Sequence, residues 1–227
     1  MPSDEWLKKE FHYGYSSGDI IAKDVVDKLR NNEESKIGGS YHQVASYLSS
    51  FINANSKVLE LGPGRGSWSK VILNKLSVKG VLHTIDFQDV SQWLDPKRKD
   101  NRIVCHKVDS FNYSFLPDDY FDLFWSFGVL CHNNIDNIYT IFNQAYSKLK
   151  KQAVLIHQYS DWNKLENYGW DKGSIPIKFK HMRDIDIWWT RNNSICMQTI
   201  LEACGYEIKE IDTGLLQRDG MFLAYKR

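Results

Sequence analysis

This chain of 227 residues has no long apolar run and no large excess of charge of either sign. It contains no run of about 18 apolar residues, so no membrane-spanning helix and no membrane partner are expected. Residues 1–11, MPSDEWLKKEF, mix acids with lysines and lack the apolar segment of a secretory signal. The net charge of +1 provides no general attraction to nucleic acid.

The cysteines and histidines lack metal-site spacing. Cys105, Cys131, Cys196 and Cys204 form no CxxC pair, and most of them lie in apolar segments. This pattern is typical of reduced, buried thiols, so a cytoplasmic location is expected. Because no HxxxH pair and no suitably spaced group of acids occurs either, we expect no metal site.

From residue 57 onward, strand and helix patterns alternate. Short apolar runs predict strands, and apolar positions at helical spacing predict helices. The predicted strands are 57–61, 81–86, 102–109, 121–128, 153–160, 206–212 and 220–226, and the predicted helices are 66–77, 135–150 and 194–204. This alternation predicts an α/β fold with a largely parallel sheet covered by helices on both faces, closed by an antiparallel C-terminal pair.

Two regions fall outside the alternation. Residues 1–55 are interpreted as an N-terminal helical lid that precedes a core of residues 56–227. Within the core, residues 161–192 form a long insertion rich in Trp, Lys and Arg. A loop of this length in a compact domain is usually functional, so we expect it to cap the substrate.

Three glycines follow the first predicted strand in ELGPGRG, residues 60–66. Gly62 and Gly64 permit positive φ and close approach of the backbone to a ligand, and Gly66 lets the next helix pack against the strand. The spacing is ExGxGxG, whereas dinucleotide-binding turns have GxGxxG. Glu60 is unfavourable beside a pyrophosphate and favours a cationic ligand.

With its flanking strands, this motif resembles the first motif of class I S-adenosylmethionine-dependent methyltransferases of the small-molecule type. The resemblance covers roughly residues 57–227 and implies a Rossmann-like, seven-stranded sheet. It implies S-adenosyl-L-methionine as the methyl donor and S-adenosyl-L-homocysteine as the product. It also implies donor-binding roles for Glu60, Gly62, Gly64, Gly66, Asp86, Phe87, Asp109, Ser110, Phe111, Ser126, Phe127 and Tyr15.

Two of these acids have simple alternative interpretations. Asp86 ends the second predicted strand, where an acid accepts hydrogen bonds from ribose hydroxyls, but it is also compatible with an ordinary loop acid. The resemblance implies that Asp109 contacts the adenine amino group, and a helix cap or turn is the alternative.

Two histidines are the candidate general bases for a hydroxyl or amine acceptor. His132 follows the fourth predicted strand and His157 lies within the fifth, so both are expected near the edge where ligands bind. A neutral imidazole is suited to take a proton near pH 7. The alternatives are a helix-flanking role for His132 and a core position for His157.

The acceptor site is expected to combine aromatic rings with a cation. The candidates are Tyr13, Tyr41, Tyr159, Trp162, Trp170 and Arg191. Cations in 161–192 favour an anionic acceptor, such as a phosphorylated, sugar or nucleotide-linked molecule, whereas Asp171, Asp184 and Asp186 offset them.

The leading hypothesis is therefore methyl transfer to an oxygen or nitrogen of a small molecule. The chain has no basic stripe and no NPPY-type tetrapeptide after the fourth strand, so nucleic acid is not an expected partner. A monomer and a homodimer are both compatible with the sequence. The alternative hypotheses are a nicotinamide-dependent oxidoreductase and a non-catalytic S-adenosylmethionine-binding module.

Overall fold

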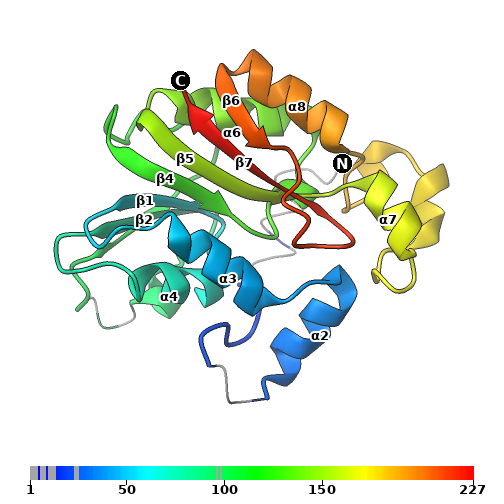
Figure 1. Ribbon diagram of the computed structural model, residues 1–227, viewed down its shortest axis with the longest axis horizontal. Helices are drawn as coiled ribbons and strands as arrows, with labels where there is room; N and C mark the ends of the chain where they lie inside the picture. The colour runs from blue at the N-terminus through cyan, green and yellow to red at the C-terminus, as the bar shows by residue number, and fades with distance from the viewer. Residues whose placement is uncertain (1–4, 6–8, 10–13, 23–25, 96, 98) are drawn as a thin grey trace.

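The computed structural model describes residues 5, 9, 14–22, 26–95, 97 and 99–227 (Figure 1). Its centre is a seven-stranded sheet in the order β3-β2-β1-β4-β5-β7-β6. The strands are β1 (Lys57–Leu61), β2 (Val81–Asp86), β3 (Ile103–Lys107), β4 (Phe121–Ser126), β5 (Leu149–Tyr159), β6 (Tyr206–Glu210) and β7 (Gly220–Lys226). Neighbours from β3 to β5 pair in parallel, and β7 is antiparallel to both β5 and β6. The predicted Rossmann-like fold is confirmed.

Helices cover both faces of the sheet (Figure 1). The described helices are α2 (Lys28–Ile37), α3 (Tyr41–Ser50), α4 (Ser67–Leu73), α5 (Ser91–Leu94), α6 (Ile135–Tyr146), α7 (Trp162–Tyr168) and α8 (Ser194–Ala203), with 3-10 turns η1 (Leu130–His132), η2 (Ile177–His181) and η3 (Asp184–Asp186). In the part of the chain that the structure describes, no helix is long and apolar enough to cross a bilayer.

The apolar strand runs are buried because each strand contributes to two cores. In β1, Val58 packs with side chains of α3 and α4, whereas Leu59 packs with side chains of α6 and α8. Successive side chains of a strand point to opposite faces, so a continuous apolar run is needed when both faces are covered.

Two predicted helix ends were wrong. The helix predicted over 66–77 is α4, which ends at Leu73. The apolar spacing predicted a helix to residue 150, but α6 ends at Tyr146 and β5 already begins at Leu149. Leu149 is opposite Phe121 of β4, and the register then shifts before Leu123. Pairing with β4 therefore overrides the helical pattern at these residues.

The insertion at 161–192 has a core of its own. Leu165, Trp170, Ile175 and Phe179 cluster with other buried side chains around Cys131 of η1. The N–H of Thr190 also donates to the carbonyl of Cys131 at 2.9 Å. The insertion is thus packed against the sheet edge beyond β4.

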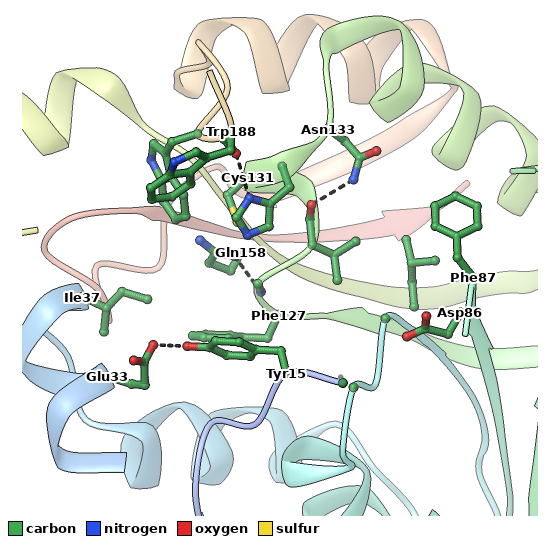
Figure 2. A pocket seen from close by; sticks show the side chains of 18 of the residues that line it. Tyr15, Glu33, Ile37, Asp86, Phe87, Phe127, Cys131, Asn133, Gln158 and Trp188 are labelled. Carbon is green, nitrogen blue, oxygen red and sulfur yellow. Dashed lines mark hydrogen bonds between the residues drawn. The ribbon is translucent and has the colours of Figure 1, made fainter. Parts of the chain in front are cut away.

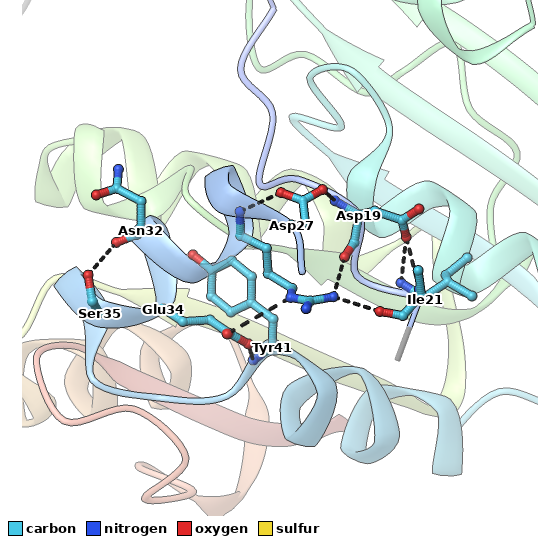
Figure 3. Close-up of polar contacts among 9 residues, drawn as sticks. Asp19, Ile21, Asp27, Asn32, Glu34, Ser35 and Tyr41 are labelled. Atoms are coloured by element: carbon cyan, nitrogen blue, oxygen red, sulfur yellow. Dashed lines mark hydrogen bonds and ion pairs between the residues drawn. The ribbon is translucent and has the colours of Figure 1, made fainter. Parts of the chain in front are cut away.

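Hydrogen bonds connect residues 19–22 to the start of α2 (Figure 3). Asp27, the N-cap of α2, accepts from the N–H of Arg30 at 2.9 Å and from the N–H of Asp19 at 2.8 Å. Nη1 of Arg30 donates to the carbonyls of Asp19 and Ala22, each at 2.8 Å. These bonds fix residues 19–22 relative to α2.

Candidate active site

A cavity of about 410 Å³ lies beyond the carboxyl ends of β1, β2 and β4 (Figure 2). The order of the sheet reverses between β1 and β4, and this is where open α/β sheets bind ligands. The turn after β1, the end of β2, the turn after β4, residues of α2 and residues of the insertion all contribute to its wall.

The glycine turn after β1 has the predicted backbone conformation. Gly62, Gly64 and Gly66 have φ values of 65°, 53° and 83°. A Cβ on Gly62 would lie 2.4 Å from Val129, and one on Gly64 would lie 2.3 Å from the carbonyl oxygen of Tyr15. The turn therefore excludes side chains at both cavity-lining glycines, whereas Gly66 caps α4 behind it.

Two carboxyl groups lie near this turn. Glu60 is buried, and Oγ of Ser69 donates to its Oε2 at 2.6 Å, while Oε1 has no partner among the described residues. Burial raises the pKa of Glu60 to about 8. Asp86 lines the cavity and accepts the N–H of Gln88 at 2.8 Å, and burial raises its pKa as well. A cationic ligand would favour the ionised form of both.

These features fit S-adenosylmethionine. The glycine turn can hold its polar groups by backbone N–H donors, and Asp86 lies at the strand end where ribose hydroxyls are accepted. Glu60, which was predicted to bind the donor, lies behind the turn and does not line the cavity. Phe87 and Phe111 line the same cavity, with ring centroids 5.5 Å apart.

Asp109 and Ser110 do not line this cavity. They belong to a neighbouring polar hollow at the end of β3 together with Cys105 and His106. No group of three or more potential ligands among the described side chains is placed to hold a metal ion.

His132 lies on the cavity wall at the end of η1. Its Nδ1 is 2.7 Å from the carbonyl oxygen of Trp188, which can only accept, so Nδ1 carries the proton. Nε2 therefore carries the lone pair in the neutral ring. Burial lowers the pKa of His132 to about 4, and the ring is edge-on to Trp189 at 5.6 Å.

His157 occupies the sheet core. Its ring lies among those of Phe124, Phe142 and Phe222, and its Nδ1 is 2.7 Å from Oγ of Ser126. Burial lowers its pKa to about 3. Neither His157 nor Ser126 lines the cavity, because both side chains point into the core from neighbouring parallel strands.

The predicted acceptor residues fall into four groups. Tyr41 and the donor candidates Tyr15 and Phe127 line the cavity, and Tyr13 lies outside the described residues. Tyr159 is buried at the end of β5, an inner strand, where its OH donates to the carbonyl of Ile211 at 2.9 Å.

The remaining candidates are engaged inside the insertion. Trp162 and Trp170 pack edge-to-face at 4.9 Å. Arg191 pairs with Asp184 and donates to the carbonyl of Met182 at 2.6 Å. None of these three side chains lines the cavity, because they hold the insertion together.

Several cavity residues are absent from the sequence-based prediction. They include Glu33, Lys36, Gln158 and Arg218. The strand alternation in β5 offered one signal, since a core-facing His157 places Gln158 on the other face. The charged residues carry no local signal, because their positions depend on how α2 and the β6–β7 connection fold back over the sheet.

Comparison with known proteins agrees with this architecture. Residues 34–209 match a family described as a methyltransferase domain. A phosphoethanolamine N-methyltransferase of Plasmodium falciparum is 29% identical over 121 residues, which cover 53% of this chain and 44% of that protein. The match thus spans less than half the length of this curated relative.

Two solved structures share the fold. The magnesium protoporphyrin IX methyltransferase of Synechocystis PCC 6803, with bound S-adenosylhomocysteine, has a TM-score of 0.61 at 14% identity over 92% of this chain and 91% of that one. The phosphoethanolamine N-methyltransferase 2 of Haemonchus contortus, in complex with phosphomonomethylethanolamine and S-adenosylhomocysteine, has a TM-score of 0.55 at 17% identity over 75% of this chain and 38% of that one. The chain therefore belongs to the methyltransferase-domain family, with the class I fold of S-adenosylmethionine-dependent methyltransferases.

Proposed function

We propose that this methyltransferase moves a methyl group from S-adenosylmethionine to an oxygen or nitrogen of a small, anionic molecule. The main support for the proposal is that the glycine turn, Asp86 and His132 line one cavity. The donor when bound supplies a methyl group made electrophilic by its sulfonium. The protein then has to position the acceptor and take its proton.

In this proposal the turn and the strand ends hold the donor. Gly62 and Gly64 let the backbone approach the donor closely, and Asp86 accepts hydrogen bonds from the sugar. Phe87 and Phe111 provide apolar surface for the base. Glu60, behind the turn, contributes negative charge when ionised.

His132 is proposed to take the acceptor proton at Nε2. The bond from Nδ1 to the carbonyl of Trp188 fixes both the tautomer and the ring orientation. The lowered pKa keeps the imidazole neutral at physiological pH, so Nε2 is unprotonated there. His157 is not assigned this role, since its ring does not reach the cavity wall.

Residues of the N-terminal region are proposed to cover the acceptor. Tyr15 and Tyr41 line the cavity, and the OH of Tyr15 donates to Glu33 of α2 (Figure 2). The N–H of Arg65 donates to the carbonyl of Tyr15 at 2.8 Å, which joins this region to the glycine turn. Closure here would exclude water from the transfer.

An anionic acceptor has support from two sides. Lys36 and Arg218 both line the cavity. The curated relative is named for phosphoethanolamine, and one fold relative contains phosphomonomethylethanolamine.

A cytoplasmic location is also proposed, and the four free cysteines support it. A monomer or a homodimer is proposed as the oligomeric state.

The direct test has two stages. Isothermal titration with S-adenosylhomocysteine measures donor-site binding, and labelled S-adenosylmethionine then reports methyl transfer to a panel of phosphorylated and unphosphorylated amines and alcohols. Binding followed by transfer supports the proposal. Tight binding with no transfer to any acceptor would instead support a non-catalytic module.

A further inference from the structure

Arg218 lies at the cavity wall, just before β7. Its side chain is buried, and its guanidinium lies over the ring of Trp189 at 4.3 Å. The sequence predicted an anion-binding cation in the insertion, but Lys180 and Arg183 there pair with acids outside the cavity. Among the described residues, the Lys and Arg side chains on the cavity wall are Arg218 and Lys36.

The hydrogen bonds of Arg218 leave part of its guanidinium open. Nε and Nη2 donate to the two oxygens of Asp219 at 2.9 and 2.8 Å, and Nη1 donates to the carbonyl of Gly173 at 2.9 Å. A guanidinium has about five N–H donors. One N–H on each terminal nitrogen is thus left without a partner among the described residues.

The position of Gly173 indicates which N–H groups these are. A Cβ on Gly173 would lie 2.9 Å from Cδ and 3.3 Å from Cγ of Arg218, so this residue packs along the stem of the side chain. This packing is compatible with a bond to its carbonyl from the Nη1 hydrogen on the Cδ side. The two open N–H groups then lie side by side at the tip, in the fork that matches an oxyanion.

The fork is held rigidly from behind. Asp219 is fully buried, and Nε2 of Gln158 also donates to it at 2.7 Å. Oε1 of Gln158 in turn accepts the N–H of Gly128 at 2.9 Å (Figure 2). A donor group already fixed in this way loses little conformational freedom when a ligand binds.

We propose that Arg218 is the specificity-determining residue of the acceptor site and binds an oxyanion of the methyl acceptor through this fork. The inference rests on the proposed function and adds the group that recognises the acceptor. Lys36 of α2 lines the same cavity, and its Nζ is 2.8 Å from Glu33. Glu33 also lines the cavity and offsets this charge, whereas Asp219, the acid paired with Arg218, is fully buried and outside the cavity wall.

The test titrates protein saturated with S-adenosylhomocysteine with inorganic phosphate, acetate and glycerol, following backbone amide signals by NMR in the parent and in each variant. We expect the parent to bind phosphate or acetate but not glycerol. Arg218→Lys keeps a charge beside Asp219 but loses the fork, so oxyanion affinity should fall about 10- to 100-fold. Affinity for S-adenosylhomocysteine should change less than about threefold, by the additivity of separate sites.

Arg102→Lys is the matched control. Arg102 is likewise paired with an acid, Asp100, and with backbone carbonyls, but it lies outside the cavity. It should leave oxyanion binding unchanged. If Arg218→Lys does not fold, the double variant Arg218→Gln with Asp219→Asn removes both charges and is measured in its place.

The outcomes separate this inference from the proposed function. Equal oxyanion binding by parent and variant, or none by the parent, means that Arg218 forms only a structural ion pair, and the inference fails. Failure of the parent to bind S-adenosylhomocysteine would overturn the proposed function instead. Phosphate binding without acetate binding identifies the oxyanion as a phosphate, and the reverse identifies a carboxylate.

Discussion

Nδ1 of His132 lies 2.7 Å from the carbonyl oxygen of Trp188. The two residues are far apart in the sequence, and the contact forms because the insertion packs against η1 through Cys131. A backbone acceptor at Nδ1 leaves the lone pair on Nε2. The insertion thus determines the protonation pattern of the candidate base.

His132→Gln should lower kcat by about 10²- to 10⁴-fold, the usual contribution of a general base. Affinity for S-adenosylhomocysteine should stay nearly unchanged, because the donor-binding turn is intact. Transfer of labelled methyl and isothermal titration measure the two effects. His181→Gln is the control, since His181 is exposed and does not line the cavity. Full activity of His132→Gln would rule out His132 as the base.

Gly64→Ala should weaken S-adenosylhomocysteine binding by more than about tenfold, since backbone strain of 1–3 kcal/mol falls on the binding turn. The φ of 53° disfavours a side chain, and the new Cβ would lie 2.3 Å from the carbonyl oxygen of Tyr15. Hydrogen exchange should also increase at residues 14–22. Gly214→Ala is the control, because Gly214 has a φ of 71° with nothing within 4 Å. Unchanged binding by Gly64→Ala would contradict the close approach of backbone and donor.

Asp86→Asn should reduce donor affinity by about 10- to 100-fold, because hydrogen bonds to a charged acceptor contribute roughly 1.5–3 kcal/mol. The amide keeps the size of the side chain but cannot accept on both atoms. Titration with S-adenosylhomocysteine measures the loss, with exposed Asp171→Asn as the control. If Asp86→Asn bound the ligand as tightly as the parent does, the placement of the donor would be wrong.

Glu60→Gln should stabilise the ligand-free protein at alkaline pH. The pKa of Glu60 is raised from 4.5 to about 8 in the folded state, so its stability contribution is full below pH 4.5 and is lost as pH rises toward 8. The variant has no such loss, and its advantage in the free energy of unfolding should grow by about 3–5 kcal/mol over this range.

Thermal unfolding from pH 4.5 to pH 9 checks this prediction, with exposed Glu207→Gln as the control. The same Glu60→Gln change should weaken binding of the cationic donor more than binding of neutral S-adenosylhomocysteine. A constant stability difference across the pH range would show that Glu60 titrates normally.

The sequence predicted the sheet well because burial on both faces imposes continuous apolar runs. β1, β2 and β7 have the predicted bounds, and the antiparallel C-terminal pair is confirmed. The glycine turn could also be predicted, since few residues other than glycine adopt its positive φ values. The end of α6 could not be predicted from the sequence, because pairing of Leu149 with β4 is a long-range contact.

The acceptor side of the cavity shows the limit of sequence reasoning. His132 and His157 were both predicted near the carboxyl ends of strands. His132 lies on the cavity wall, whereas His157 lies among phenylalanine rings in the core. The orientation of a strand residue depends on register, which local composition does not reveal. Arg191 and Arg218 likewise differ in their tertiary contacts. Arg191 donates to the carbonyl of Met182, whereas Arg218 donates to the carbonyl of Gly173.

By itself, the sequence determined the fold and the donor turn, because periodic burial and glycine conformation are local properties of the chain. Only the tertiary structure decided which histidine and which arginine reach the cavity. Those side chains come from segments distant in sequence, and packing of the insertion and of α2 against the sheet brings them together.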